Sequence, residues 1–278
     1  MRLSPLLPPL GPLKIVDVGA MMFADAGDPY ERLRRSVPCH VVGFEPVAAE
    51  CDKLNERRRP GDVYLPYVIG DGSTRTFYEC NFSMTSSLFE PNAPLLSKFQ
   101  NLNEQTQVVR TSRVETRRLD DLPETAGVDY LKLDVQGAEM LVLQGAEARL
   151  ADALVVHTEV LFVELYRGQA LFGDIDGLLR ARGFVLHQLS QTGSAFKPVI
   201  LNDDINGPGS QILWGDAVYV RDFMTLERLS PEKLLKLALI LDENYGSIDY
   251  VTYALGVYDR VAETSLRTAY MKVLATPA

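Results

Sequence analysis

Near the start of the chain stands the stretch Lys14-Ile15-Val16-Asp17-Val18-Gly19-Ala20. Its β-branched residues favour a buried strand, and its glycine lets a ligand approach the backbone where the chain leaves that strand. Similar apolar runs end at Gly43-Phe44-Glu45-Pro46 and at Tyr130-Leu131-Lys132-Leu133-Asp134. Because such runs alternate with helical stretches, the sequence predicts an α/β fold with a mostly parallel sheet of about seven strands.

The expected elements follow from the apolar spacing and from proline and glycine punctuation. Asp28 and Pro29 are expected to start the first helix. Residues 72–118 are less regular and are expected to form a lid or an acceptor-binding insertion. Strands are expected at 14–18, 40–44, 63–69, 76–80, 128–134, 154–160, 185–189 and 217–220, and helices at 29–35, 47–58, 139–145 and 175–182.

The texture changes after Asp222, where leucines recur at helical spacing. We therefore expect a main domain over residues 1–222 and a helical extension over 223–278, which packs on that domain or on a partner.

Composition excludes several classes of protein. The 28 basic and 37 acidic residues give a net charge of −9, which repels nucleic acid phosphates. The chain has three cysteines, Cys39, Cys51 and Cys80, without C-x-x-C spacing, so neither a disulfide framework nor a zinc knuckle is expected. This cysteine usage predicts a reducing, cytoplasmic location. Prolines interrupt the apolar N-terminus, which disfavours a signal peptide, and no apolar run reaches the roughly 18 residues of a membrane span.

Four carboxylates stand where predicted strands end: Asp17, Glu45, Asp71 and Asp134. Ligands of open α/β sheets bind at these strand ends, and a carboxylate after the second strand can accept hydrogen bonds from a ribose diol. A G-x-G-x-x-G run is absent, which disfavours a dinucleotide, whereas carboxylates suit a positively charged sulfonium. The alternative is that these residues are only helix caps and turn residues.

The chain resembles the FkbM-type methyltransferases, class I S-adenosylmethionine enzymes with a doubly wound, Rossmann-like sheet. The resemblance covers most of residues 14–190 and is most specific in YLKLDVQGAEMLVLQG at 130–145. Its other motifs are Val16-Asp17-Val18-Gly19-Ala20, Gly43-Phe44-Glu45-Pro46, Thr85-Ser86-Ser87-Leu88, Leu119-Asp120-Asp121-Leu122, His157-Thr158-Glu159-Val160, Leu165-Tyr166-Arg167-Gly168-Gln169 and Gly183-Phe184.

The resemblance implies S-adenosylmethionine as the cofactor and assigns roles to several residues. Asp17, Gly19 and Ala20 would line its methionine part, Glu45 with the adjoining Pro46 would meet the ribose, Asp71 would meet the adenine amine, and Asp134 would form the edge of the methyl-transfer site. One departure stands out, because the family's first loop usually continues with Asn and a second Gly, whereas Met21-Met22-Phe23 follows here.

Methyl transfer to a hydroxyl needs an aligned acceptor and a base. Asp134 and His157 are the candidate bases. His157 and Glu159 share one face of a strand, and a structural hydrogen-bonded pair is the alternative. A magnesium ion held by Asp134 and Glu159 is a further expectation, and Ser86 is expected to bind the cofactor or the acceptor unless it belongs to an ordinary turn.

These observations predict an O-methyltransferase that acts on a hydroxyl of a sugar, a glycan or a small natural product. Two alternatives stay open: a degenerate, non-catalytic relative that acts through protein interactions, and an NAD-dependent oxidoreductase. Assembly into a homo-oligomer stays open as well.

Overall fold

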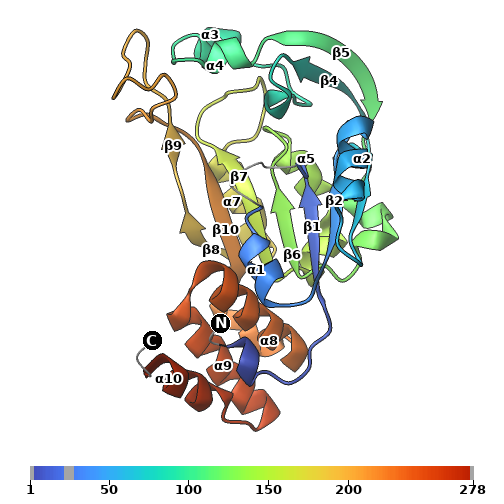
Figure 1. The fold of residues 1–278 in the computed structure, drawn as a ribbon, viewed down its shortest axis with the longest axis vertical. Coiled ribbons are helices and arrows are strands. Elements are labelled where there is room, and N and C mark those ends of the chain that lie inside the picture. The colour runs from blue at the N-terminus through green and yellow to red at the C-terminus, as the bar shows by residue number, and fades with distance from the viewer. Residues whose placement is uncertain (1–2, 22–27, 276–278) are drawn as a thin grey trace.

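The computed structural model describes residues 3–21 and 28–275, and its centre is an eight-stranded sheet (Figure 1). The strand order is β3-β2-β1-β6-β7-β10-β8, with β9 paired to β10. The neighbouring pairs from β3 to β7 are parallel, and β10 is antiparallel to both of its neighbours, so the predicted mostly parallel sheet is confirmed. The strands are β1 Leu13–Val18, β2 Cys39–Phe44, β3 Val63–Leu65, β6 Tyr130–Leu133, β7 Val155–Leu161, β8 Phe184–Leu189, β9 Thr192–Gly193 and β10 Ile212–Arg221.

The order of the sheet reverses between β1 and β6, because β2 and β3 lie on one side of this pair and β7 on the other. β1 and β6 are buried along almost their whole length, as is typical of central parallel strands covered on both faces. Open α/β sheets bind ligands at such a switch point. The fold therefore places a crevice where β1 and β6 end.

Helices cover both faces of the sheet. One face carries Ile15 and Val155, which share a buried cluster with Leu237 and Val251 from the C-terminal helices. The opposite face, with Val16 and Leu131, packs against the helices between β6 and β8. The helices are η1 Ser4–Leu6, α1 Glu31–Ser36, α2 Ala48–Glu56, η3 Leu119–Asp121, η4 Pro123–Thr125, α5 Glu139–Gln144, α6 Glu147–Asp152, α7 Phe172–Ala181, η5 Phe223–Arg228, α8 Pro231–Ile240, η6 Leu241–Tyr245, α9 Ile248–Ala262 and α10 Leu266–Ala275.

The irregular segment contains an antiparallel hairpin, β4 (Thr74–Cys80) with β5 (Val108–Glu115), that forms a second sheet. Figure 1 shows it beyond the carboxyl ends of β1 and β2, at the opposite end of the molecule from α8–α10. Three short helices connect its strands: η2 (Ser83–Thr85), α3 (Ala93–Leu96) and α4 (Leu102–Gln105). All three lie within residues 72–118, for which no helix was predicted.

Some predicted boundaries need correction. β3 ends at Leu65 rather than at residue 69, because Pro66 cannot donate a hydrogen bond to the neighbouring strand. Asp28 does not cap the first helix, since α1 begins after Tyr30 and has no side-chain cap. Within the described ranges, no helix is long and apolar enough to cross a membrane.

Candidate active site

A cavity of about 380 Å³ opens at the carboxyl ends of β1, β2 and β6. Four of the predicted site residues line it: Gly19, Glu45, Pro46 and Asp134. The hairpin side of the cavity includes Ser86, which was also predicted to belong to the site. The structure therefore brings together five predicted residues from segments that are far apart in the sequence.

Gly19 allows the ends of β1 and β6 to approach each other. Its φ is +82°, and a Cβ atom built on it would lie 1.9 Å from the carbonyl oxygen of Asp134, so no other residue fits without a backbone shift. The amides of Gly19 and Ala20 both donate to the carbonyl of Phe44, at 3.1 and 3.0 Å, which ties the turn to β2. Ala20 itself is buried and does not line the cavity.

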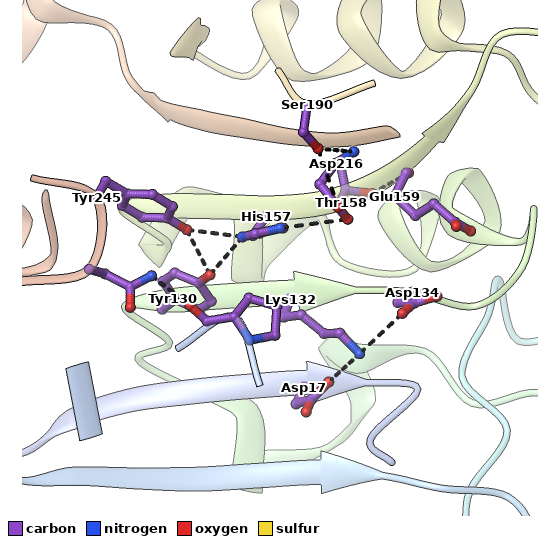
Figure 2. A network of polar contacts seen from close by, with 12 residues as sticks. Asp17, Tyr130, Lys132, Asp134, His157, Thr158, Glu159, Ser190, Asp216 and Tyr245 are labelled. Carbon is purple, nitrogen blue, oxygen red and sulfur yellow. Dashed lines mark hydrogen bonds and ion pairs between the residues drawn. The ribbon is translucent and has the colours of Figure 1, made fainter. Parts of the chain in front are cut away.

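Asp17 lies beneath the cavity rather than in its wall. Its Oδ1 is 3.1 Å from Nζ of Lys132, and its Oδ2 accepts a hydrogen bond of 2.6 Å from the Tyr30 hydroxyl. The same ammonium donates to the carbonyl of Gly19 at 2.8 Å and lies 3.8 Å from Asp134 (Figure 2). Lys132 thus joins the β1 turn to the end of β6, and Asp17 reaches the cavity wall through this contact.

Glu45 lines the cavity from the end of β2. One of its oxygens accepts a hydrogen bond of 2.7 Å from the amide of Val47, which orients the carboxyl group. Burial raises the pKa of Glu45 to about 6. The group is therefore a carboxylate at neutral pH and can accept hydrogen bonds from hydroxyl groups.

Asp71 is engaged elsewhere. Its carboxylate accepts hydrogen bonds from Ser73 and pairs with Arg75 at 2.5 Å, and it does not line the cavity. Burial by itself pushes its pKa up, but the bonds from Ser73 and Arg75 outweigh that effect and lower the pKa of Asp71 to about 2. Its predicted contact with an adenine amine stays a prediction.

Gln136 is a site residue that the sequence did not single out. It stands at φ +54°, lines the cavity, and its Nε2 donates to Asp134 at 3.0 Å and to Glu159 at 3.2 Å. The hydroxyls of Ser87 and Tyr166 donate to its main-chain and side-chain oxygens, at 2.6 and 3.1 Å. The only signal in the sequence is its place beside Gly137 in the turn that follows the strand.

Two further carboxyl groups lie behind Asp134. Glu139 accepts hydrogen bonds from the amides of Val135 and Gly137 and therefore braces the turn after β6, while burial raises its pKa to about 7. Burial, followed by the nearby charge of Asp134, raises the pKa of Glu159 well above its usual range.

His157 points away from the cavity, toward the C-terminal helices. Its Nδ1 lies 3.0 Å from the Tyr130 hydroxyl and 3.1 Å from the Tyr245 hydroxyl, and its Nε2 lies 3.7 Å from Asp216 (Figure 2). The alternative of a hydrogen-bonded pair with Glu159 is wrong, because that glutamate bonds to Gln136 and the imidazole to the two tyrosines. The role of His157 as a base stays a prediction.

A magnesium site finds no support among the described residues, which contain no group of three or more His, Cys, Asp or Glu side chains that could hold a metal ion. Gln136 places an amide donor against both Asp134 and Glu159, where a cation would need acceptors.

In the atypical first loop, Met21 lines the cavity, and Met22 and Phe23 lie outside the described residues.

Comparison with known proteins relates the chain to a family. The model of the Methyltransferase FkbM domain matches residues 17–186. The 2-O-methyltransferase NoeI of Sinorhizobium fredii is 46% identical over 164 residues, which cover 56% of this chain and 66% of that protein. The match thus spans just under two thirds of the relative's length.

Among solved structures, magnesium protoporphyrin IX methyltransferase of Synechocystis PCC 6803 with bound S-adenosylmethionine is similar at 11% identity and a TM-score of 0.37, over 76% of this chain and 71% of that one. A methyltransferase of Mesorhizobium loti is similar at 12% identity and a TM-score of 0.34, over 79% of this chain and 95% of that one. Similarities this distant say nothing about the site.

The family match begins at Asp17 and extends through the whole segment that supplies Gly19, Glu45, Ser86 and Asp134 to the cavity. It is consistent with the predicted doubly wound sheet of a class I methyltransferase, and the structure shows a mostly parallel sheet whose order reverses between β1 and β6. Since residues 17–186 are more than half of its 278 residues, the chain belongs to the family of FkbM methyltransferase domains.

Proposed function

We propose that the protein is an S-adenosylmethionine-dependent O-methyltransferase that acts on a hydroxyl of a sugar, a glycan or a small natural product. The observation that carries the proposal is the cavity at the switch point of the sheet, with Gly19, Glu45 and Asp134 in its wall. The family match and the relative that is a 2-O-methyltransferase support it.

The cavity suits this cofactor better than a dinucleotide. Its volume of about 380 Å³ is in the range of small-molecule sites. Its described wall includes the carboxylates of Glu45, Glu50, Glu79 and Asp134 and contains neither lysine nor arginine. A pyrophosphate would find no positive charge there, whereas a sulfonium would be stabilised by the carboxylates.

Three residues of the cavity wall have distinct tasks in the proposal. Glu45 would hold the ribose hydroxyls, and Gly19 would let the methionine part approach the backbone. The bound cofactor supplies a methyl group on a positively charged sulfur. Asp134, whose side chain is 35% exposed, would orient the acceptor hydroxyl and take its proton; of the two predicted bases, it is the one that lines the cavity.

The cellular setting forms part of the same proposal. Cys39, Cys51 and Cys80 are all free, which suits a reducing cytoplasm. The net charge of −9 disfavours a nucleic acid acceptor and leaves a small molecule or a glycan as the substrate class.

Calorimetric titration with S-adenosylmethionine and with its demethylated product tests the proposal, with and without magnesium. We expect saturable binding by the wild-type protein and at least a tenfold weaker binding by Glu45→Ala, since a charged hydrogen bond contributes roughly 1.5–3 kcal/mol. Glu56→Ala, an exposed change at the end of helix α2, which follows Glu45 in the chain, serves as the control and should bind normally. Absence of binding by the wild-type protein would favour the non-catalytic alternative.

A further inference from the structure

The C-terminal extension contacts residues that are linked to the cavity wall, although it lies outside the residues that match the family, 17–186. Its contact point is η6 (Leu241–Tyr245), a π-helical turn between α8 and α9. Such turns are rare and occur frequently at functional sites. Asp242 anchors this one from behind, because it accepts hydrogen bonds from the amide of Leu3 at 3.0 Å and from the Tyr270 hydroxyl at 2.5 Å.

Two consecutive side chains of the turn contact other parts of the fold. Nδ2 of Asn244, a buried residue, donates to the carbonyl of Pro29 at 2.8 Å. The Tyr245 hydroxyl lies 2.7 Å from the Tyr130 hydroxyl and 3.1 Å from Nδ1 of His157 (Figure 2). The turn therefore contacts both the entry to α1 and the strands β6 and β7.

Both contacts converge on Tyr30, the residue after Pro29. The ring of Tyr130 packs edge-on against the ring of Tyr30, with centroids 6.0 Å apart. The Tyr30 hydroxyl in turn donates to Asp17 at 2.6 Å. Tyr30 is thus held between the C-terminal turn and the first strand.

From Asp17 the contacts continue into the cavity wall. Lys132 lies 3.1 Å from the carboxylate of Asp17 and donates to the carbonyl of Gly19 at 2.8 Å. Gly19 lines the cavity, and its turn has little freedom because its Cα closely approaches the backbone of Asp134. A shift of Tyr30 would therefore move a carboxylate whose other contacts set the position of the cavity wall.

We propose that Asn244 and Tyr245 are positioning residues of the cofactor site: the C-terminal turn holds Pro29 and Tyr30, and through Asp17 and Lys132 it sets the geometry of the Gly19 turn. The inference rests on the proposed function and deepens it. In this proposal the extension supports the geometry of the methyltransferase site through the π-helical turn.

Two variants and a matched control test this assignment. Asn244→Ala removes the donor to Pro29, and Tyr245→Phe removes one hydroxyl while keeping the ring. Tyr250→Phe is the control, because this hydroxyl of the same extension donates at 2.5 Å to the carbonyl of Arg221 in β10 and not to the entry of α1 or to β6 and β7. For each variant we would measure the Kd for S-adenosylmethionine, the melting temperature and the amide hydrogen exchange of α1.

We expect Asn244→Ala and Tyr245→Phe to raise the Kd about fivefold each, the effect of losing one ordinary hydrogen bond. Exchange in α1 should be faster in both, whereas Tyr250→Phe should lower only the melting temperature. An unchanged Kd and unchanged exchange in both variants, with normal binding by the wild-type protein, would overturn the inference alone. Absence of binding by the wild-type protein would overturn the proposed function and this inference with it.

Discussion

Lys132 is a charged side chain in the centre of the sheet, only 3% exposed. Burying an isolated charge at such a depth costs free energy, so the ammonium group of Lys132 needs partners of opposite charge or hydrogen-bond acceptors. Asp17 and the carbonyl of Gly19 supply them at 3.1 and 2.8 Å. The parallel register places Lys132 directly beside Asp17, which explains why a lysine can occupy a strand that is otherwise apolar.

We predict that Lys132→Met destabilises the protein by about 3–5 kcal/mol, because it leaves Asp17 buried without its cation. The double variant Asp17→Asn/Lys132→Met should recover much of this loss, since neither partner is then charged. Urea unfolding of the two single variants and the double variant measures the coupling. Equal destabilisation of the double and the summed single variants would show that the pair does not act as a unit.

Helix α8 is attached to the sheet by both charge and packing. Lys233 and Lys236 lie 2.9 and 3.0 Å from Asp129, which directly precedes β6. On its apolar face, Leu237 belongs to the same buried cluster as Ile15 of β1. The division of the chain at residue 222 stays a prediction, and this shared cluster bears on whether the two parts unfold separately.

Leu237→Ala tests that question at the level of elements. We expect a loss of about 2–5 kcal/mol of unfolding free energy, as for other fully buried leucines. Because the cluster is shared, the sheet and the extension should unfold in one transition. Circular dichroism and tyrosine fluorescence should both report this same transition. Met224→Ala, at a side chain that is 71% exposed, should have little effect. Separate transitions would indicate an independent extension.

Across the described part of the molecule, buried carboxyl groups dominate the response to pH. Burial raises the pKa of Asp28 and of Glu45 to about 6, that of Glu139 to about 7, and that of Glu159 well above its usual range. A carboxyl group whose pKa is higher in the folded state stabilises the fold below its unfolded pKa, and this stabilisation is lost as the pH rises through the folded pKa. His187, whose pKa burial lowers, acts in the opposite direction.

We therefore predict that the melting temperature falls as the pH is raised from about 5 to about 8. The reason is that the four carboxyl groups lose stabilisation as the pH rises through this window, whereas His187 gains it. The Glu139→Gln variant keeps an oxygen for the amide of Val135 and should show a smaller fall. Scanning calorimetry across this range checks the prediction, and a melting temperature that stays level or rises with pH would contradict it.

Much of the fold and part of the site could be predicted because both follow from local patterns. The strands around Asp17, Phe44 and Asp134 are apolar runs that end in polar residues, and parallel strands must bring such ends together. The β5 strand was not predicted, because it is largely exposed and therefore lacks a strong apolar pattern. Gln136 was also missed, since its importance lies in the partners that it joins.

Strand periodicity and strand ends are encoded over a few residues, so the sequence alone predicts the mostly parallel sheet and the position of Glu45 and Asp134 at strand ends. The folded structure, in contrast, sets how charges and hydroxyls are paired. It turned His157 toward Tyr245, tied Asp71 to Arg75, and brought Asn244 to Pro29. In the first and the third of these pairs the two residues are far apart in the chain. Such pairings depend on where buried polar groups find partners, and this is settled by packing of the whole molecule.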